Sequence, residues 1–151
     1  MKALSLIQPW ASLVAIGAKL YETRSWQTNY RGEIAIHASK NKEALNLCLQ
    51  QPFVDVLFKR RTWDSAVPLG GIVAVVNVLG CAPAEQYDQP PYSDMLGIYE
   101  RAFGDWSPGR YVWQLADIRL LPEPVPCRGA LGIWNVVPDI EAQVRRLLEI
   151  G

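Results

Sequence analysis

The hydrophobic pattern at the start of the chain predicts a strand, a helix and a second strand. Residues Lys2 to Ile7 form a short, mostly apolar run that is typical of a strand. Pro9 suits the first turn of a helix, because its missing N–H would have no helical partner there. We expect this helix to run from Pro9 to Ile16 and to end at Gly17, since glycine accepts the left-handed backbone of a helix cap. A strand from Leu20 to Trp26 follows.

Later segments continue this mixture of short elements. Glu33 to Ala38 alternates between apolar and less apolar positions, which predicts a strand with Ile34 and Ile36 on one face. Ile72 to Leu79 is almost continuously apolar, which predicts a strand buried on both faces. Two further strands are expected at Tyr111–Leu121 and Ala130–Val137, and helices at Asn41–Gln50 (with Asn41 as N-cap), Phe53–Arg60, Asp94–Phe103 and Pro138–Leu148.

About six unevenly spaced strands with helices between them predict an α+β fold. The chain lacks a regular β-α-β-α alternation, so a doubly wound parallel sheet is less favoured than a small, mixed, mostly antiparallel β-barrel. Its 151 residues suit a single domain spanning residues 1–151.

Charge and composition exclude several classes of protein. Fifteen Lys and Arg balance fifteen Asp and Glu, so a protein that grips many phosphates by bulk charge is not expected, although a local basic patch is compatible with this balance. Half of the residues are hydrophobic, which excludes wholesale disorder. Cys48, Cys81 and Cys127 lie far apart without a C-x-x-C pair, and the chain has one histidine. We therefore expect neither a disulfide framework nor a metal site, and no cofactor.

The N-terminal residues resemble a weak secretory signal, since Lys2 precedes a largely apolar stretch up to Ala18. However, Gln8-Pro9-Trp10 interrupts this stretch, and the unpaired cysteines suit a reducing compartment. No apolar run approaches the ~20 residues that span a bilayer. We expect a cytoplasmic protein without membrane contact.

The most informative segment for chemistry runs from Gly17 to Trp26. Strand alternation places Glu22 and Arg24 on one face. Lys19 has the opposite parity, but it lies at the start of the strand, where a turn can still direct it toward the same cleft. The simpler interpretation is a surface Glu22–Arg24 pair, which adds little stability.

Basic and aromatic residues are interleaved in this part of the chain. Residues 17–42 hold five basic side chains against two acidic ones, close to Trp10, Trp26 and Tyr30. Aromatic faces stack nucleobases at ~1–3 kcal/mol each, and cations bind phosphate oxygens, so the pattern favours a ligand with both groups. The simpler interpretations are core packing for the aromatics and a hydrogen-bonded strand position for His37.

Standard catalytic motifs are weak. Ser39 lies two residues from His37 and on the same strand face, but there is no G-x-S-x-G and no carboxylate clearly placed to orient the imidazole. Neither a Walker A sequence nor a G-x-G-x-x-G occurs.

Taken together, several motifs resemble the ASCH family, whose fold is similar to that of PUA domains. The central motif is G-x-K-x-x-E-x-R, formed by Gly17, Lys19, Glu22 and Arg24. The other matching segments are Leu4–Ala11, Trp26, Tyr30–Gly32, His37–Ser39, Gly71–Val73 and Gly129–Trp134, whereas residues 82–109 match nothing. The resemblance implies a β-barrel with helices at its mouth and a cleft in which Lys19, Glu22 and Arg24 meet.

The resemblance also implies a function. ASCH domains are proposed to bind RNA or nucleotide-like ligands, so the leading hypothesis is an RNA- or nucleotide-binding module. In it Lys19 and Arg24 hold an anionic group, and Glu22 orients Arg24 or accepts a hydrogen bond from a base or ribose. The remaining predicted ligand-binding residues are Gln8, Trp10, Trp26, Tyr30, Arg31, His37, Ser39 and Lys40.

Two other classes of function remain open. Some bacterial ASCH proteins look like amidohydrolases that act on acylated cytidine, and ribonuclease activity has been attributed to the group. In such a hydrolase Lys19 would be the general base, Glu22 its acid partner and Arg24 the oxyanion stabiliser. Those amidohydrolases have threonine at the position of Glu22, and Thr23 is expected to face away. Finally, the acidic segment 82–109 could contact an unknown protein partner or cover the cleft, but a variable insertion is the simpler interpretation.

Overall fold

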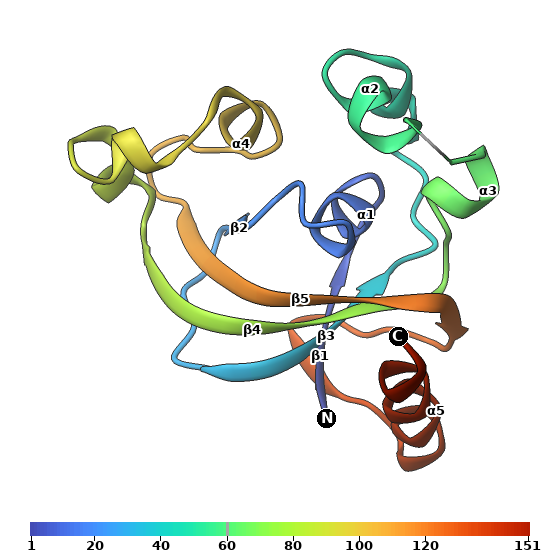
Figure 1. Cartoon of the computed structure of the whole chain (residues 1–151). Helices are drawn as coiled ribbons and strands as arrows, with labels where there is room; N and C mark the ends of the chain where they lie inside the picture. The colour runs from blue at the N-terminus through green and yellow to red at the C-terminus, as the bar shows by residue number, and fades with distance from the viewer. Residues whose placement is uncertain (60) are drawn as a thin grey trace.

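The computed structural model describes residues 1–59 and 61–151. A six-stranded mixed sheet curls into a half-barrel with the strand order β2-β5-β4-β3-β1-β6 (Figure 1). The strands are β1 (Lys2–Leu6), β2 (Tyr21–Arg24), β3 (Gly32–Ala38), β4 (Gly71–Pro83), β5 (Tyr111–Pro126) and β6 (Ile133–Asn135). The helices are α1 (Trp10–Ala15), α2 (Phe53–Leu57), α3 (Trp63–Ala66), α4 (Ile98–Ala102) and α5 (Pro138–Ile150), with 3-10 turns η1 (Leu45–Leu49), η2 (Ala84–Asp88) and η3 (Ser93–Met95).

The sheet confirms the predicted α+β, mostly antiparallel architecture. Among the strands of residues 1–59 and 61–151, β1 and β3 pair in parallel and every other neighbouring pair is antiparallel. Figure 1 shows α1, α2 and α4 on the concave side of the sheet, whereas α5 packs on the opposite side. Among the helices of the described residues, none has the length and apolar character needed to cross a membrane.

Strand alternation divides the core into two parts. Leu4, Leu6, Ile34 and Ile36 point into the half-barrel and are almost fully buried. Ala3 and Ala35 point outward and pack with Val144 of α5 and its neighbours. Ser5 and His37 are register partners, and their parity directs them to the same outward side.

Several element boundaries confirm the sequence prediction in type but not in length. Gly17 has a φ of +77° and follows the end of the first helix, as expected. The strand predicted to end at Leu121 continues to Pro126 as β5. Beyond Gln114 this strand has no further pairing with β2, so prolines without an N–H are tolerated on its open side.

The helix predicted from Asn41 to Gln50 is wrong, because only the 3-10 turn η1 forms there. The side chain of Ser39 accepts a hydrogen bond from the Asn41 N–H, and Asn41 Oδ1 accepts one from the Glu43 N–H. Such local bonds compete with helix formation. The helix predicted from Phe53 ends at Leu57, and its expected terminus at Arg60 lies outside the described residues.

The other differences arise at turns. The helix α3 was not predicted, although Thr62 and Ser65 form a capping box at its start. The strand expected at Ala130–Val137 is shortened to β6, because Gly132 with a φ of +64° belongs to a turn. Residues 94–103 form η3 and α4 instead of one continuous helix.

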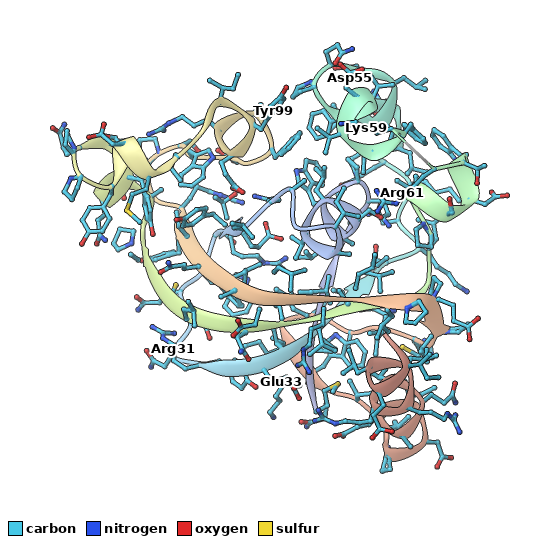
Figure 2. The ribbon with its side chains drawn as sticks, viewed as in Figure 1. Arg31, Glu33, Asp55, Lys59, Arg61 and Tyr99 are labelled. Carbon is cyan, nitrogen blue, oxygen red and sulfur yellow. The ribbon has the colours of Figure 1, made fainter. Side chains whose placement is uncertain are left out.

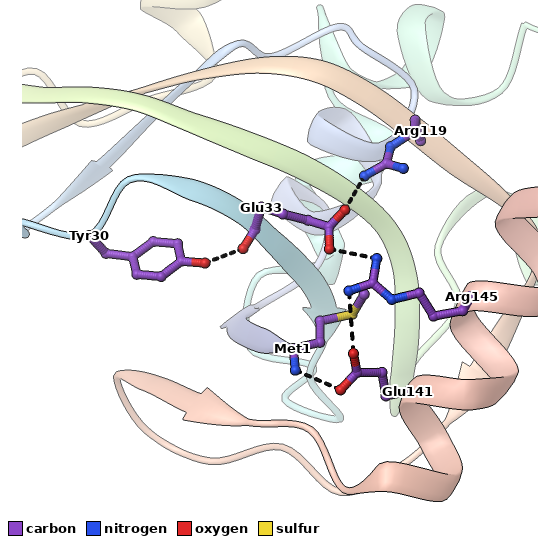
Figure 3. Close-up of polar contacts among 6 residues, drawn as sticks. All are labelled: Met1, Tyr30, Glu33, Arg119, Glu141 and Arg145. Carbon is purple, nitrogen blue, oxygen red and sulfur yellow. Dashed lines mark hydrogen bonds and ion pairs between the residues drawn. The ribbon is translucent and has the colours of Figure 1, made fainter.

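An ionic network ties α5 to the sheet (Figure 3). The Glu33 carboxylate lies 2.6 Å from Arg119 and 2.7 Å from Arg145, and Arg145 also contacts Glu141 at 3.3 Å. Glu141 in turn accepts a hydrogen bond of 2.6 Å from the amino group of Met1. Burial acts to raise the pKa of Glu33, but the two guanidinium groups outweigh it and lower the pKa below the usual range.

Candidate functional site

A cavity of about 250 Å³, here called the Arg24 cavity, lies at the end of β1. Its walls include Leu6, Trp10, Glu22, Thr23, Arg24 and Arg110, together with residues 103–105. Strand alternation along β2 places Glu22 and Arg24 on this wall, as the sequence predicts. The opposite wall comes from the segment that precedes β5.

Two guanidinium groups line the Arg24 cavity, and they differ in how far their donors are already engaged. Arg24 Nη1 donates to the Ser5 carbonyl at 3.5 Å, the long limit of a hydrogen bond, and no carboxylate in residues 1–59 or 61–151 forms an ion pair with it. Arg110 Nη2 donates to the Thr23 carbonyl at 2.8 Å, and its buried Nε has no hydrogen-bond partner. Asp105 lies 3.7 Å from that nitrogen. The cavity therefore presents directional donors.

Carboxylates balance these cations. Glu22 is buried, with 6% of its surface exposed, and its Oε1 accepts a hydrogen bond from the Thr23 N–H. Hydrogen bonds from Ser107 lower the pKa of Asp105, so this carboxylate is ionised at neutral pH. Two guanidinium groups thus face two acidic side chains, and the cavity can select a ligand by directed hydrogen bonds more than by net charge.

Lys19 lies behind the wall of the Arg24 cavity rather than on it. Its side chain is fully buried, and the ammonium donates to the carbonyl of Tyr21. A Cβ added at Gly104 would lie 3.3 Å from Lys19 Nζ, so the glycine backbone covers the ammonium. The predicted meeting of Lys19, Glu22 and Arg24 is therefore incomplete in this structure: Glu22 and Arg24 share the cavity, and Lys19 does not line it.

Glu100 of α4 belongs to the buried surroundings of Lys19. It accepts a hydrogen bond from the Leu20 N–H, and its second carboxylate oxygen is buried without a partner. Burial raises the pKa of Glu100, while the Leu20 N–H and the positive charge of Lys19 act in the opposite direction. This acidic partner comes from residues 82–109, for which a cover over the cleft was one of the alternatives left open by the sequence.

Part of that acidic segment closes the Arg24 cavity. Trp10 Nε1 donates to the Phe103 carbonyl at 2.6 Å, and the Asp105 N–H donates to Thr23 Oγ1 at 3.1 Å. Thr23 thus lines the cavity, contrary to the expectation that it faces away. The reason is that residues 103–105 fold over β2, which is an edge strand, and reach the side chain from beyond the sheet.

A second cavity of about 810 Å³, here called the His37 cavity, lies on the outward side of β1 and β3. It is lined by Ser5, His37, Ser39, Lys40 and Gly70, together with residues 126–131. It therefore gathers three of the predicted ligand-binding residues, but in a different cavity from Trp10, Glu22 and Arg24. The sequence placed all of them in one cleft.

His37 is held by hydrogen bonds at both ring nitrogens. Nε2 lies 2.9 Å from the Cys127 carbonyl, which can only accept, so Nε2 carries the proton. Nδ1 then accepts from the Ser5 hydroxyl at 3.0 Å, and Ser5 Oγ accepts from Trp134 Nε1 at 3.1 Å. Burial lowers the pKa of His37, although the Cys127 carbonyl opposes this shift, so the imidazole is neutral at pH 7.

The two cavities adjoin at the carboxyl ends of β1 and β3. Leu6 lines the Arg24 cavity, and the preceding residue, Ser5, lines the His37 cavity. The Ser39 N–H donates to the Leu6 carbonyl at 2.9 Å, and Arg24 reaches the Ser5 carbonyl. The carboxyl end of β1 thus separates the Arg24 cavity from the His37 cavity.

Two of the predicted ligand-binding residues are engaged in the core and line neither cavity. Gln8 is fully buried, and its amide donates to Ser12 Oγ and the Pro68 carbonyl while accepting from the Ser12 N–H. Trp26 packs edge-to-face on Trp113, with ring centres 4.8 Å apart.

Tyr30 and Arg31 also lie outside both cavities. The Tyr30 hydroxyl donates to the Glu33 carbonyl, and burial raises the pKa of this phenol. Arg31 donates to the carbonyls of Thr28 and Tyr30 in its own turn, and Figure 2 shows it at the start of β3, away from α1, α2 and α4.

Arg110 and Arg128 line the two cavities but were not among the residues predicted from the sequence. Arg110 follows Pro108-Gly109, a turn signal that marks the start of a strand but does not reveal what the strand approaches. Arg128 precedes the matched segment at Gly129 and lines the His37 cavity. Within the described residues, no cluster of His, Cys, Asp and Glu has the arrangement of a metal site.

Comparison with known proteins decides the family. The sequence model of the ASCH domain matches residues 4–113. The chain belongs to the ASCH domain family. This confirms the resemblance that the G-x-K-x-x-E-x-R motif indicates.

Two curated relatives share part of this ASCH domain. The chain is 32% identical to human (Homo sapiens) Activating signal cointegrator 1 and 31% identical to the mouse (Mus musculus) protein, in each case over 88 residues or 57% of the chain. The match spans 15% of the length of these relatives.

Solved structures of an ASCH protein show the same fold. The crystal structure of ASCH from Zymomonas mobilis superimposes with a TM-score of 0.57 at 10% identity, covering 97% of this chain and 94% of that one. A point mutant of that protein gives 0.57 at 11% identity, covering 97% and 96%. At this identity the likeness establishes the PUA-like α+β fold.

Proposed function

We propose that this ASCH domain binds single-stranded RNA and that the Arg24 cavity receives one of its nucleotides. The main support for the proposal is that a guanidinium group without a carboxylate partner among the described residues and an aromatic ring line the same sheltered cavity. Arg24 supplies the donors, Arg110 adds a second guanidinium group to the wall, and Trp10 supplies the ring. The volume of about 250 Å³ is smaller than the ~300–1,000 Å³ typical of ligand pockets, so the cavity has room for one nucleotide at most.

Each lining group has a chemical task in this proposal. Guanidinium groups bind phosphate oxygens through directed, charge-assisted hydrogen bonds. The indole of Trp10 is partly exposed, with Nε1 fixed on the Phe103 carbonyl, so the ring is held ready to stack on a base. The Glu22 carboxylate accepts a hydrogen bond from a base amino group, which favours cytosine, adenine or guanine over uracil.

Binding is better supported than hydrolysis by this geometry. A general base must come within hydrogen-bond reach of the proton that it removes. Lys19 is fully buried, donates to Tyr21 and is covered by Gly104, so its ammonium has no surface in the Arg24 cavity. The hydrolase hypothesis requires residues 103–105 to move first, whereas binding through Arg24 and Arg110 requires no such step.

The test is a titration of fluorescein-labelled, mixed-sequence RNA octamers, followed by anisotropy at 50 mM salt. We expect wild-type protein to bind and the Arg24→Ala variant to bind at least 10-fold more weakly. Arg146→Ala on α5 is the matched control, because it removes an exposed arginine that lines neither cavity.

Arg24→Lys separates charge from geometry, because lysine keeps the charge but lacks the planar fork of donors. We expect it to recover only part of the affinity. The proposal fails if wild-type protein does not bind the octamers, or if folded Arg24→Ala binds them as tightly as wild type does.

A further inference from the structure

The His37 cavity differs from the Arg24 cavity in charge. Its lining includes two cationic residues, Lys40 and Arg128, and no carboxylate. Both residues are exposed at its edge, and neither forms an ion pair within residues 1–59 and 61–151. The lining of this larger cavity therefore favours an anion.

Two glycines shape this cavity. Gly70 has a φ of +74°, and a Cβ added there would lie 2.7 Å from Lys40 Cε and 3.1 Å from Lys40 Cγ. The absence of a side chain thus lets the stem of Lys40 lie across Gly70. At Gly129 an added Cβ would lie 2.5 Å from Ser5 Oγ and 2.6 Å from His37 Nδ1, so the loop backbone packs directly onto the cavity floor.

The floor of the cavity is polar but neutral and internally satisfied. Ser5, His37 and Trp134 form a chain of hydrogen bonds that ends on the Cys127 carbonyl. Because these groups already have hydrogen-bond partners, none of them needs a hydrogen bond from a ligand. Leu131 is 98% exposed beside it and offers an apolar surface to a sugar or base. A ligand here meets cations at the edge and a mostly apolar wall.

The position of the His37 cavity links it to the Arg24 cavity. Both are lined by residues at the carboxyl end of β1, where Ser5 faces the His37 cavity and Leu6 the Arg24 cavity. Arg24 bridges the same boundary by reaching the Ser5 carbonyl. A ligand with repeated anionic units that occupied both cavities would cross the end of β1 between them.

We infer that the His37 cavity holds the adjoining nucleotide of the same RNA chain, with its phosphate between Lys40 and Arg128. This inference rests on the proposed function of the Arg24 cavity and extends it. The ligand is then an oligonucleotide that occupies both cavities, and a nucleoside monophosphate occupies only the first.

The experiment compares binding of cytidine monophosphate, a cytidine dinucleotide and a cytidine tetranucleotide. In wild-type protein we expect affinity to rise at least 10-fold from the mononucleotide to the tetranucleotide. In Lys40→Ala/Arg128→Ala this rise disappears, while the affinity for the mononucleotide changes less than twofold. The slope of log affinity against log salt for the tetranucleotide falls by about 0.7 for each lost phosphate contact.

Lys59→Ala/Arg146→Ala is the matched control, because it removes the same charge from residues that line neither cavity. If the Lys40→Ala/Arg128→Ala variant keeps the wild-type dependence on chain length, or if the control loses it equally, the inference is overturned although the Arg24 cavity still binds. If neither mononucleotide nor tetranucleotide binds wild-type protein, the proposed function itself fails.

Discussion

The imidazole of His37 donates from Nε2 to the backbone carbonyl of Cys127 at 2.9 Å, joining two residues that lie 90 positions apart in the sequence. Through Ser5 the same ring is connected to Trp134. One neutral side chain of β3 therefore fastens both ends of the loop between β5 and β6. This connection depends on the protonation state of the ring.

Acidification should destabilise the protein through His37. Its pKa is lower in the folded state than its ordinary value of 6.5, so the unfolded chain takes up a proton first as the pH falls. Stability is therefore complete above about pH 6.5 and decreases below it, with a slope of at most about 1.4 kcal/mol per pH unit for one proton. Urea unfolding at pH 7.5, 6.5 and 5.5 measures this decrease.

The assignment to His37 is direct, because the chain contains one histidine. Glu100 also titrates with a raised pKa, but its contribution has the opposite sign, since its stabilising effect is lost as the pH rises. The His37→Gln variant should therefore lose the decline between pH 7.5 and 5.5. An unchanged pH dependence in His37→Gln would show that the assignment is wrong.

Adding one methyl group at Gly129 should loosen the floor of the His37 cavity. The new Cβ would lie 2.5 Å from Ser5 Oγ and 2.6 Å from His37 Nδ1, closer than real contacts allow. We expect Gly129→Ala to lower the free energy of unfolding by about 1–3 kcal/mol through overpacking. Chemical denaturation followed by tryptophan fluorescence measures the loss.

Gly80→Ala is the control for that measurement. A Cβ at Gly80 would make only ordinary contact, at 3.8 Å from the side-chain oxygen of Gln114. We expect it to leave stability within about 0.5 kcal/mol of wild type. Equal losses in both variants would contradict the close approach of Gly129 to the floor.

Lys19 should prove more important for stability than its place in the sequence motif suggests. Replacing it by methionine keeps most of its volume but leaves Glu100 without the positive charge that favours its ionised form. We expect Lys19→Met to cost about 2 kcal/mol at pH 8, less than the removal of one partner from a fully buried pair. The cost should shrink toward pH 5, because the raised pKa of Glu100 lets the carboxyl accept a proton.

The double variant Lys19→Met/Glu100→Gln isolates the interaction between these residues. If their charges act together, its loss of stability is smaller than the sum of the two single losses, and the extra dependence on pH disappears. Strict additivity would show that Lys19 stabilises the fold through packing and its bond to Tyr21 alone. Equilibrium unfolding of all four proteins completes this cycle.

Glu33 should stabilise the fold mainly at neutral pH and low salt. Its pKa is lowered, so the stability that it contributes is present above an ordinary value of 4.5 and is lost as the pH falls through the lower folded value. Its partners are partly exposed, so we expect Glu33→Gln to cost about 1 kcal/mol at 50 mM salt and less at 1 M. Exposed Glu43 provides the control Glu43→Gln, which should change neither stability nor its salt dependence.

The sequence predicted the elements that local chemistry defines. Gly17 ends the first helix because its backbone enters the left-handed region, and the alternation of β2 placed Glu22 and Arg24 on one face. The curled sheet as a whole was predicted from the resemblance to the ASCH family. These features depend on neighbouring residues or on a family pattern, and both are visible in one chain.

The remaining features depend on contacts between distant segments. The sequence left a cover over the cleft by residues 82–109 as one alternative, but nothing near Phe103 or Asp105 indicates that these residues close over β2 and cover Lys19. The division into two cavities was also missed, because it requires the parallel pairing of β1 with β3 and the parity of Ser5 and His37 within it. Arg110 precedes β5 and Arg128 follows it, so each reaches its cavity only because of the path that β5 takes through the fold.

The parity of Ser5 and Leu6 makes β1 intolerant of changes in length. Successive residues of a strand project to opposite faces, so one extra residue inserted between Lys2 and Ser5 would turn a leucine toward His37 and a hydroxyl into the apolar interior of the half-barrel. Both cavities would lose their shared boundary in one step. Substitutions at the ends of β1 can adjust each cavity separately, whereas a shift of its frame would dismantle both.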